Sequence, residues 1–133
     1  MLLLDACAQS PQPDVLRTRD RALLELLLTL PLPVTQVVSL TRDRLDLRQG
    51  QLDVGNAFLR LSFQFQFWTK QYLNLRRDEF QFIFIRHDHA GRPLAGLTVR
   101  SVQRIVREHA RRANLEQKVT PAALFQTALS DAR

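Results

Sequence analysis

The hydrophobic and polar positions along the chain predict a helix-rich N-terminal third. From near Val15 or Thr18 to Leu30 almost every residue favours helix, and four leucines share one wide apolar face. Pro31 and Pro33 end this helix, and Val34 to Leu40 is expected to form a second short helix or turn. The leucines of the apolar face are Leu23, Leu24, Leu27 and Leu28.

Alternating apolar and polar positions predict strands in the middle of the chain. The segment from Leu45 to Val54 alternates around a Gln-Gly pair, which is typical of a small hairpin. From Leu59 to Phe67 every second residue is apolar, so we expect a strand there. The run from Phe80 to Ile85 is also rich in strand-forming residues, and a polar turn from His87 to Gly91 follows it.

Two further helices are expected in the C-terminal third. Thr98 is a suitable N-cap for a helix that runs to about Ala113. Pro121 favours the start of a last helix, because the first helical position needs no backbone N–H donor. We therefore expect one domain of 133 residues, mainly α with a small antiparallel β-sheet at about residues 45–65.

The charge balance changes the picture of possible partners. Nineteen Lys and Arg against thirteen Asp and Glu give a formal net charge of +6, which favours a polyanionic partner. The single cysteine, Cys7, excludes an intrachain disulfide and a thiolate zinc site, so a reducing, cytoplasmic setting is expected. No window approaches the ~18 consecutive apolar residues of a membrane span, and we expect no membrane partner.

Four arginines recur along the predicted helix from Thr98 to Ala113. Their steps of four, three and four residues place them in one narrow line, while valines and alanines occupy the opposite side. Such a basic ridge suits duplex DNA, and an ordinary solvated helix face is the alternative. We call these residues the arginine stripe: Arg100, Arg104, Arg107 and Arg111.

The remaining polar clusters are expected to be structural or solvated. His87, Asp88 and His89 contain metal-binding residue types, but two histidines in one turn are usually only a polar turn. We therefore expect neither a metal nor another cofactor. The mixed-sign segments 42–44 and 76–79 are expected to be solvated salt-bridge surface.

Three stretches, taken in order, resemble the catalytic domain of tyrosine recombinases, the phage integrase family. Arg19 to Leu28 with the short helix and turn after it looks like the first catalytic box. Gly91 to Leu94, leading into the helix after Thr98, is similar to the segment before the second box, and Val119 to Thr127 looks like that box itself. The resemblance divides the single domain into a first-box region at 15–47, a small sheet at 45–65, a basic helix at 98–113 and a second-box remnant at 119–130.

The resemblance implies DNA cleavage by a tyrosine, assisted by two arginines, a histidine and a lysine around the phosphate. Pro33 occupies the position of the first-box arginine, and the turn 55–57 replaces the lysine turn. Ala122 and Phe125 occupy the histidine and arginine positions of the second box, with Gln126 at the adjacent histidine. The sequence ends at Arg133, before the family's last histidine or tryptophan and its tyrosine nucleophile.

We therefore expect a degenerate, C-terminally truncated recombinase-like domain that has no catalytic residues and is not an enzyme. Tyr72, the only tyrosine, is expected to be a packing residue. The expected activity is binding of duplex DNA through the arginine stripe, in a context of DNA recombination or integration, with Arg100 nearest a base edge. The alternative is a protein-interaction module that pairs with itself or with a full-length recombinase through its C-terminal helix, near Leu124, Phe125 and Leu129.

Overall fold

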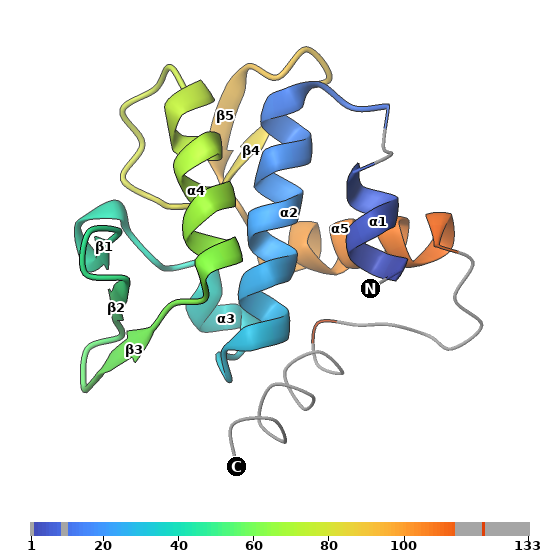
Figure 1. Cartoon of the computed structure of the whole chain (residues 1–133). Coiled ribbons are helices and arrows are strands. Elements are labelled where there is room, and N and C mark those ends of the chain that lie inside the picture. The colour runs from blue at the N-terminus through green and yellow to red at the C-terminus, as the bar shows by residue number, and fades with distance from the viewer. Residues whose placement is uncertain (1, 9–10, 114–120, 122–133) are drawn as a thin grey trace.

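Helix α2 (Asp14–Thr29) lies at the centre of the computed structural model, which describes residues 2–8, 11–113 and 121. Helix α4 (Phe63–Leu75) packs along one side of α2, and α1 (Leu2–Ala8) packs along another (Figure 1). Helix α5 (Val99–Arg112) contacts α1 and the short α3 (Val34–Val37). The four helices around α2 therefore account for most of the described fold.

Two small antiparallel sheets complete the architecture. The first contains β1 (Leu45–Asp46), β2 (Gln51–Asp53) and β3 (Phe58–Arg60), in which Leu52 pairs with both Leu45 and Leu59. A 3₁₀ turn at Arg42–Arg44 leads into it. The second is a hairpin of β4 (Ile85–His87) and β5 (Pro93–Gly96), with Ile85 opposite Gly96. Both sheets are too small to form a layer of their own, so the helices provide most of the core, to which strand residues such as Leu52 and Ile85 add.

The hydrophobic core surrounds α2 on several sides. All six residues from Ala22 to Leu27 are buried, which is typical of a helix covered by neighbours all round. Phe65 and Tyr72 of α4 and Val102 of α5 are buried against this cluster. The core thus joins the N-terminal helices to the basic helix near the end of the described chain.

Most of the predicted elements are confirmed. The mainly α fold, the long helix before Pro31, the short helix after Pro33 and the hairpin at residues 45–54 are all present. The predicted cap of α5 is also present, since the Thr98 hydroxyl oxygen accepts the backbone N–H of Ser101 at 3.1 Å. Apart from Pro121 itself, the predicted last helix and the second-box remnant lie outside the described residues.

The predicted strand from Leu59 to Phe67 is wrong in its second half. Strand β3 ends at Arg60, so the sheet does not extend to residue 65, and α4 begins at Phe63. The reason is a cap, because the Ser62 hydroxyl oxygen accepts the backbone N–H of Phe65 at 3.1 Å and starts a helix. The alternating phenylalanines then fall on different faces of α4: Phe65 is buried, whereas Phe63 is 76% exposed and Phe67 is 46% exposed.

The predicted strand from Phe80 to Ile85 is also displaced, and β4 begins only at Ile85. The Arg76 guanidinium donates hydrogen bonds to the carbonyl oxygens of Phe80, Phe82 and Ile83, at 3.3, 2.8 and 2.7 Å. These carbonyl oxygens therefore accept hydrogen bonds from a side chain and not from the backbone of a neighbouring strand. The expectation of solvated charges at 76–79 is therefore wrong for Arg76, whose side chain is fully buried.

Removing the cap of α4 is expected to destabilise the fold measurably. Ser62→Ala leaves the backbone N–H of Phe65 without its acceptor, which typically costs about 1 kcal/mol in the free energy of unfolding. Chemical denaturation followed by circular dichroism measures this loss. Gln64→Ala, at an exposed position of the same helix, is the matched control, and equal stability of the two variants would show that the cap contributes nothing.

Candidate nucleic-acid interface

Helix α5 presents one face to the core and the opposite face to solvent. Val102, Ile105 and Val106 are buried against the body of the protein. The N-terminal end is fixed by the Thr98 cap, and the Thr98 and Ser101 hydroxyls also lie 2.8 Å apart. The position of α5 is therefore set by both packing and capping.

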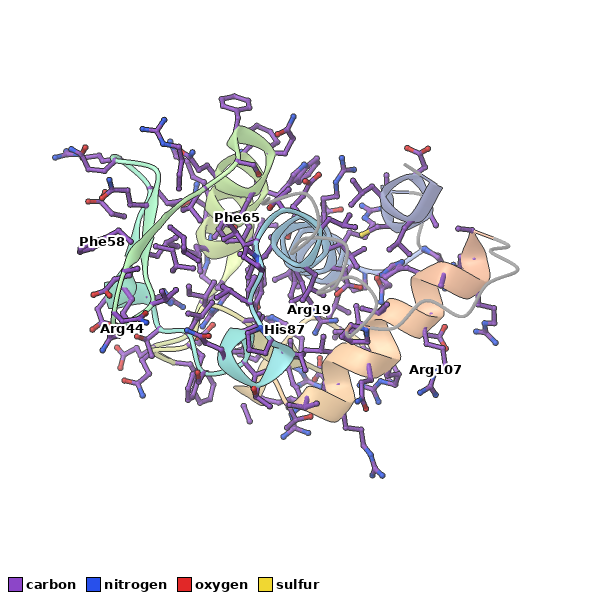
Figure 2. The ribbon with its side chains drawn as sticks, turned by 90° about the horizontal axis from the view of Figure 1, so that it is seen from below. Arg19, Arg44, Phe58, Phe65, His87 and Arg107 are labelled. Carbon is purple, nitrogen blue, oxygen red and sulfur yellow. The ribbon has the colours of Figure 1, made fainter. Side chains whose placement is uncertain are left out.

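All four residues of the arginine stripe are exposed, as the spacing predicts. Figure 2 shows Arg107 on the outer side of α5, directed away from the protein body. Arg111 forms an ion pair of 2.9 Å with Glu108, and both side chains are largely exposed. Within the described part of the chain, the other three stripe residues form no ion pair. The stripe thus offers up to four guanidinium groups to an external anion.

A buried polar network attaches α5 to α2. The His109 Nε2 atom lies 2.7 Å from Asp20 Oδ2, and the Arg19 Nε atom donates to Asp20 Oδ1 at 2.8 Å. The side chains of Asp20 and His109 are 1% and 2% exposed. Burial opposes ionisation of Asp20, but the charge of Arg19 and the hydrogen bond from His109 outweigh it and lower the pKa of the carboxyl. This network fixes the orientation in which the stripe faces solvent.

Among the described residues, the polar side chains of the turn from His87 to Gly91 form hydrogen bonds that hold the turn in place. His87 Nε2 lies 2.9 Å from the hydroxyl of Tyr72, and His87 Nδ1 lies 3.0 Å from the carbonyl oxygen of Gly91. Burial lowers the pKa of His87, which favours its neutral form. Asp88 closes the turn by accepting the backbone N–H groups of Ala90 and Arg92. No group of three metal-binding side chains occurs among the residues that the structure describes.

Sequence comparison finds tyrosine recombinases among the proteins similar to this chain. No established family profile matches the chain. The tyrosine recombinase XerD of Haemophilus ducreyi is 36% identical over 83 residues, which are 58% of this chain and 27% of that protein. XerD of Vibrio vulnificus is 46% identical over 52 residues, which are 38% of this chain and 17% of the relative.

Solved structures match over almost the whole chain. A crystal structure of XerA recombinase aligns with a TM-score of 0.81 and 18% identity, over 98% of this chain and 47% of XerA. XerH site-specific recombinase, in a pre-cleavage complex with its difH substrate, aligns with a TM-score of 0.73 and 16% identity, over 99% of this chain and 41% of XerH. The chain thus has a tyrosine recombinase-like fold, and part of its sequence is similar to XerD. At such low identity the structural likeness concerns the fold, and the domain spans about a quarter of the length of the Haemophilus relative.

Within the recombinase-like domain, the position that the resemblance assigns to the first-box arginine is an exposed proline. Pro33 precedes α3, and its carbonyl oxygen accepts the backbone N–H groups of Gln36 and Val37. The turn 55–57 between β2 and β3 contains glycine, asparagine and alanine, and its first backbone N–H donates to Asp53. Neither segment contains a cation. Ala122, Phe125 and Gln126 lie outside the described residues.

Sequence reasoning missed two features of the recombinase-like domain. Arg112 is exposed on a flank of α5, one residue outside the spacing that defines the stripe. The contact of Asp20 with His109 joins positions 89 residues apart, so no local pattern points to it.

Among the described helices, none has the length and apolar character to cross a membrane.

Proposed function

We propose that the chain is a catalytically inactive recombinase-like domain that binds duplex DNA through the arginine stripe, in a context of DNA recombination. The observation that carries the proposal is the exposure of all four stripe arginines on one face of a helix that is fixed to the core. The related XerH was solved in complex with its difH substrate. A net charge of +6 favours association with the same kind of polyanion.

The dimensions of the stripe fit a DNA groove. Arg100 and Arg111 are separated by eleven helical positions, or roughly 16 Å at about 1.5 Å per residue. The major groove is about 12 Å wide, so a helix that enters it with its capped end brings the far end of the stripe close to the phosphates. Arg100, next to the capped end, is the stripe residue that we assign to a base edge. The other three are assigned to phosphates.

The absence of catalysis is supported by the side chains at the positions that the resemblance marks. Pro33 cannot donate a charged hydrogen bond to a phosphate, and the turn 55–57 supplies no lysine. Removing a single preorganised donor typically lowers the rate by ~10²- to 10³-fold, so the joint loss of several leaves no useful turnover. Binding of DNA without cutting is the activity that remains.

A protein-interaction module is the second candidate, and exposed aromatic side chains favour it. Phe58 of β3 is 70% exposed, and Phe63 and Phe67 follow at the start of α4 with large exposed fractions. Exposed apolar side chains of this size are common at protein interfaces. In this case the partner is a second copy or a full-length recombinase, and DNA does not bind.

Replacing the whole stripe by alanine is expected to abolish most of the DNA affinity. If each arginine neutralises one phosphate, the slope of log affinity against log salt concentration is at most about 3.6 in magnitude, from ~0.9 per contact, and approaches zero in the variant. Fluorescence anisotropy with a labelled duplex at several salt concentrations measures both quantities. The single variants separate the roles: Arg100→Ala is expected to relax sequence preference by roughly 1 to 3 kcal/mol, and Arg107→Ala to weaken all sequences alike.

The control removes the same charge from another surface. Arg44, Arg48, Arg60 and Arg77 are exposed outside α5, and their joint replacement by alanine also lowers the net charge by four. If both quadruple variants lose affinity equally, only the overall charge matters and the stripe is an ordinary solvated face. If the protein instead forms a dimer whose stability does not depend on salt concentration, and if it does not bind DNA, the interaction module is favoured.

A further inference from the structure

A pocket of about 620 Å³ lies between the first half of α2, the β4–β5 hairpin and one flank of α5. It is separate from the region of Pro33, which follows the other end of α2. Of the arginine stripe, only Arg104 lines it, because the pocket adjoins the flank of α5 rather than its outer face. Its volume falls within the range of ~300 to 1,000 Å³ that is usual for small-ligand sites.

The walls of the pocket carry an excess of uncompensated positive charge. Its three acidic side chains already have cationic partners: Asp20 is bonded to Arg19 and His109, Asp88 to Arg92, and Glu108 to Arg111. Three arginines that line the pocket form no ion pair or hydrogen bond with any residue that the structure describes. These are Arg86, Arg104 and Arg112, contributed by β4 and α5.

Two buried polar atoms of pocket residues also have no hydrogen-bond partner in the described structure. They are the Oε1 atom of Gln12 and the Nδ1 atom of His109, whose side chain is almost completely buried. Buried polar atoms are rarely left unpaired, because each lost hydrogen bond costs free energy. Leu16 and Ile105 are among the apolar residues that line the pocket. The pocket therefore combines a cationic rim, an apolar wall and unfilled hydrogen-bonding capacity.

We propose that this pocket binds a phosphate group, with Arg86, Arg104 and Arg112 as the donors. Guanidinium groups pair bidentately with phosphate oxygens, and a tetrahedral dianion can receive donors from several directions. A single carboxylate would leave most of the positive charge uncompensated, and a metal cation would be repelled by the arginines. Gln12 and His109 are then available to form hydrogen bonds with the part of the ligand that is attached to the phosphate.

Two sources can supply the phosphate group. One is a free phosphate monoester, whose organic part would pack against the apolar side chains that line the pocket. The other is a backbone phosphate of duplex DNA that lies along the arginine stripe and reaches the pocket beside Arg104. Only the second source rests on the proposed function, and the two differ in whether DNA competes with a small phosphate.

The test uses calorimetric titration of the whole chain with adenosine monophosphate, inorganic phosphate and adenosine. Arg86→Gln and Arg112→Gln remove pocket donors that lie outside the stripe, and Arg107→Gln is the matched control in the stripe but outside the pocket. We expect each pocket variant to weaken binding of the phosphate-bearing probes by roughly tenfold, as for loss of one charged hydrogen bond, and the control to leave it unchanged. Adenosine, which lacks the phosphate, is expected not to bind. All three substituted positions are exposed, and thermal melting verifies that the variants remain folded.

The same variants distinguish the sources in a DNA titration. If the source is DNA, Arg86→Gln and Arg112→Gln lower DNA affinity and reduce the salt slope by about one each, and duplex DNA displaces inorganic phosphate. If the source is a free monoester, both variants bind DNA like the parent, and adenosine monophosphate binds more tightly than phosphate even with DNA present. The proposal is overturned if neither small probe binds and the pocket variants bind DNA like the parent. If only the proposed function is wrong, neither the parent nor any variant binds DNA, but the parent still binds adenosine monophosphate.

Discussion

A DNA substrate that traps covalent intermediates is expected to give no covalent complex with this chain. The variant that combines Pro33→Arg, Ala122→His and Phe125→Arg is expected to give none either. The reason is the nucleophile: Tyr72 is the only tyrosine of the 133 residues, and it is fully buried. Its hydroxyl lies 2.9 Å from His87 and accepts the backbone N–H of Ile85, so it cannot reach a phosphodiester. Burial also raises the pKa of Tyr72, which opposes formation of the reactive phenolate.

Denaturing electrophoresis of the labelled substrate measures the covalent complex directly. A full-length tyrosine recombinase on its own substrate serves as the positive control for trapping. Tyr72→Phe is the informative second variant, because it removes the only phenolic oxygen of the chain. Any adduct formed by the parent would refute the assignment as an inactive domain, and loss of that adduct in Tyr72→Phe would identify the nucleophile.

Asp20→Asn is expected to destabilise the fold by about 3 to 5 kcal/mol, the usual cost of breaking a buried ion pair by removing one partner. The substitution preserves the size of the side chain but leaves Arg19 buried without its anion, and it weakens the bond to His109. Since this bond joins α2 to α5, the substitution is expected to loosen the attachment of α5, the helix that carries the arginine stripe. Chemical denaturation of both proteins at neutral pH measures the difference. Glu79→Gln, at an exposed position, controls for removal of one negative charge and is expected to be nearly neutral.

The effect of Asp20→Asn is expected to depend on pH in a definite direction. The pKa of Asp20 is lowered in the fold from its ordinary value of 3.8, so its ion pairs contribute fully above about pH 4. Their contribution is lost as the pH falls through the lowered pKa. The stability difference between the parent and Asp20→Asn should therefore narrow progressively below about pH 4. A difference that stays constant down to the acid transition would show that ionisation of Asp20 does not stabilise the fold.

Local sequence patterns were sufficient where each element contains its own start and stop. The run of leucines followed by Pro31 and Pro33 predicts α2 and its end, and Thr98 predicts the start of α5. They failed where two local signals compete. From Leu59 to Phe67 the alternation favours strand, but the Ser62 cap and the packing of Phe65 into the core favour helix. A pattern of period two cannot show which of these contributions is larger.

The sequence by itself determined that this protein has a basic helix with one charged face, because helical spacing alone aligns the stripe arginines. Through the resemblance it also predicts which side chains stand at the positions of the recombinase cations, with Pro33 at that of the first-box arginine. Only the tertiary structure decided which charges are buried and which are free. Arg76 and Asp20 resemble surface residues in sequence, yet Arg76 is buried against nearby carbonyl oxygens, and Asp20 pairs with His109, 89 positions away. Arg86 and Arg112, on β4 and α5, line the same pocket. The physical reason is that burial and pairing of a charge depend on contacts between remote segments, which no local periodicity encodes.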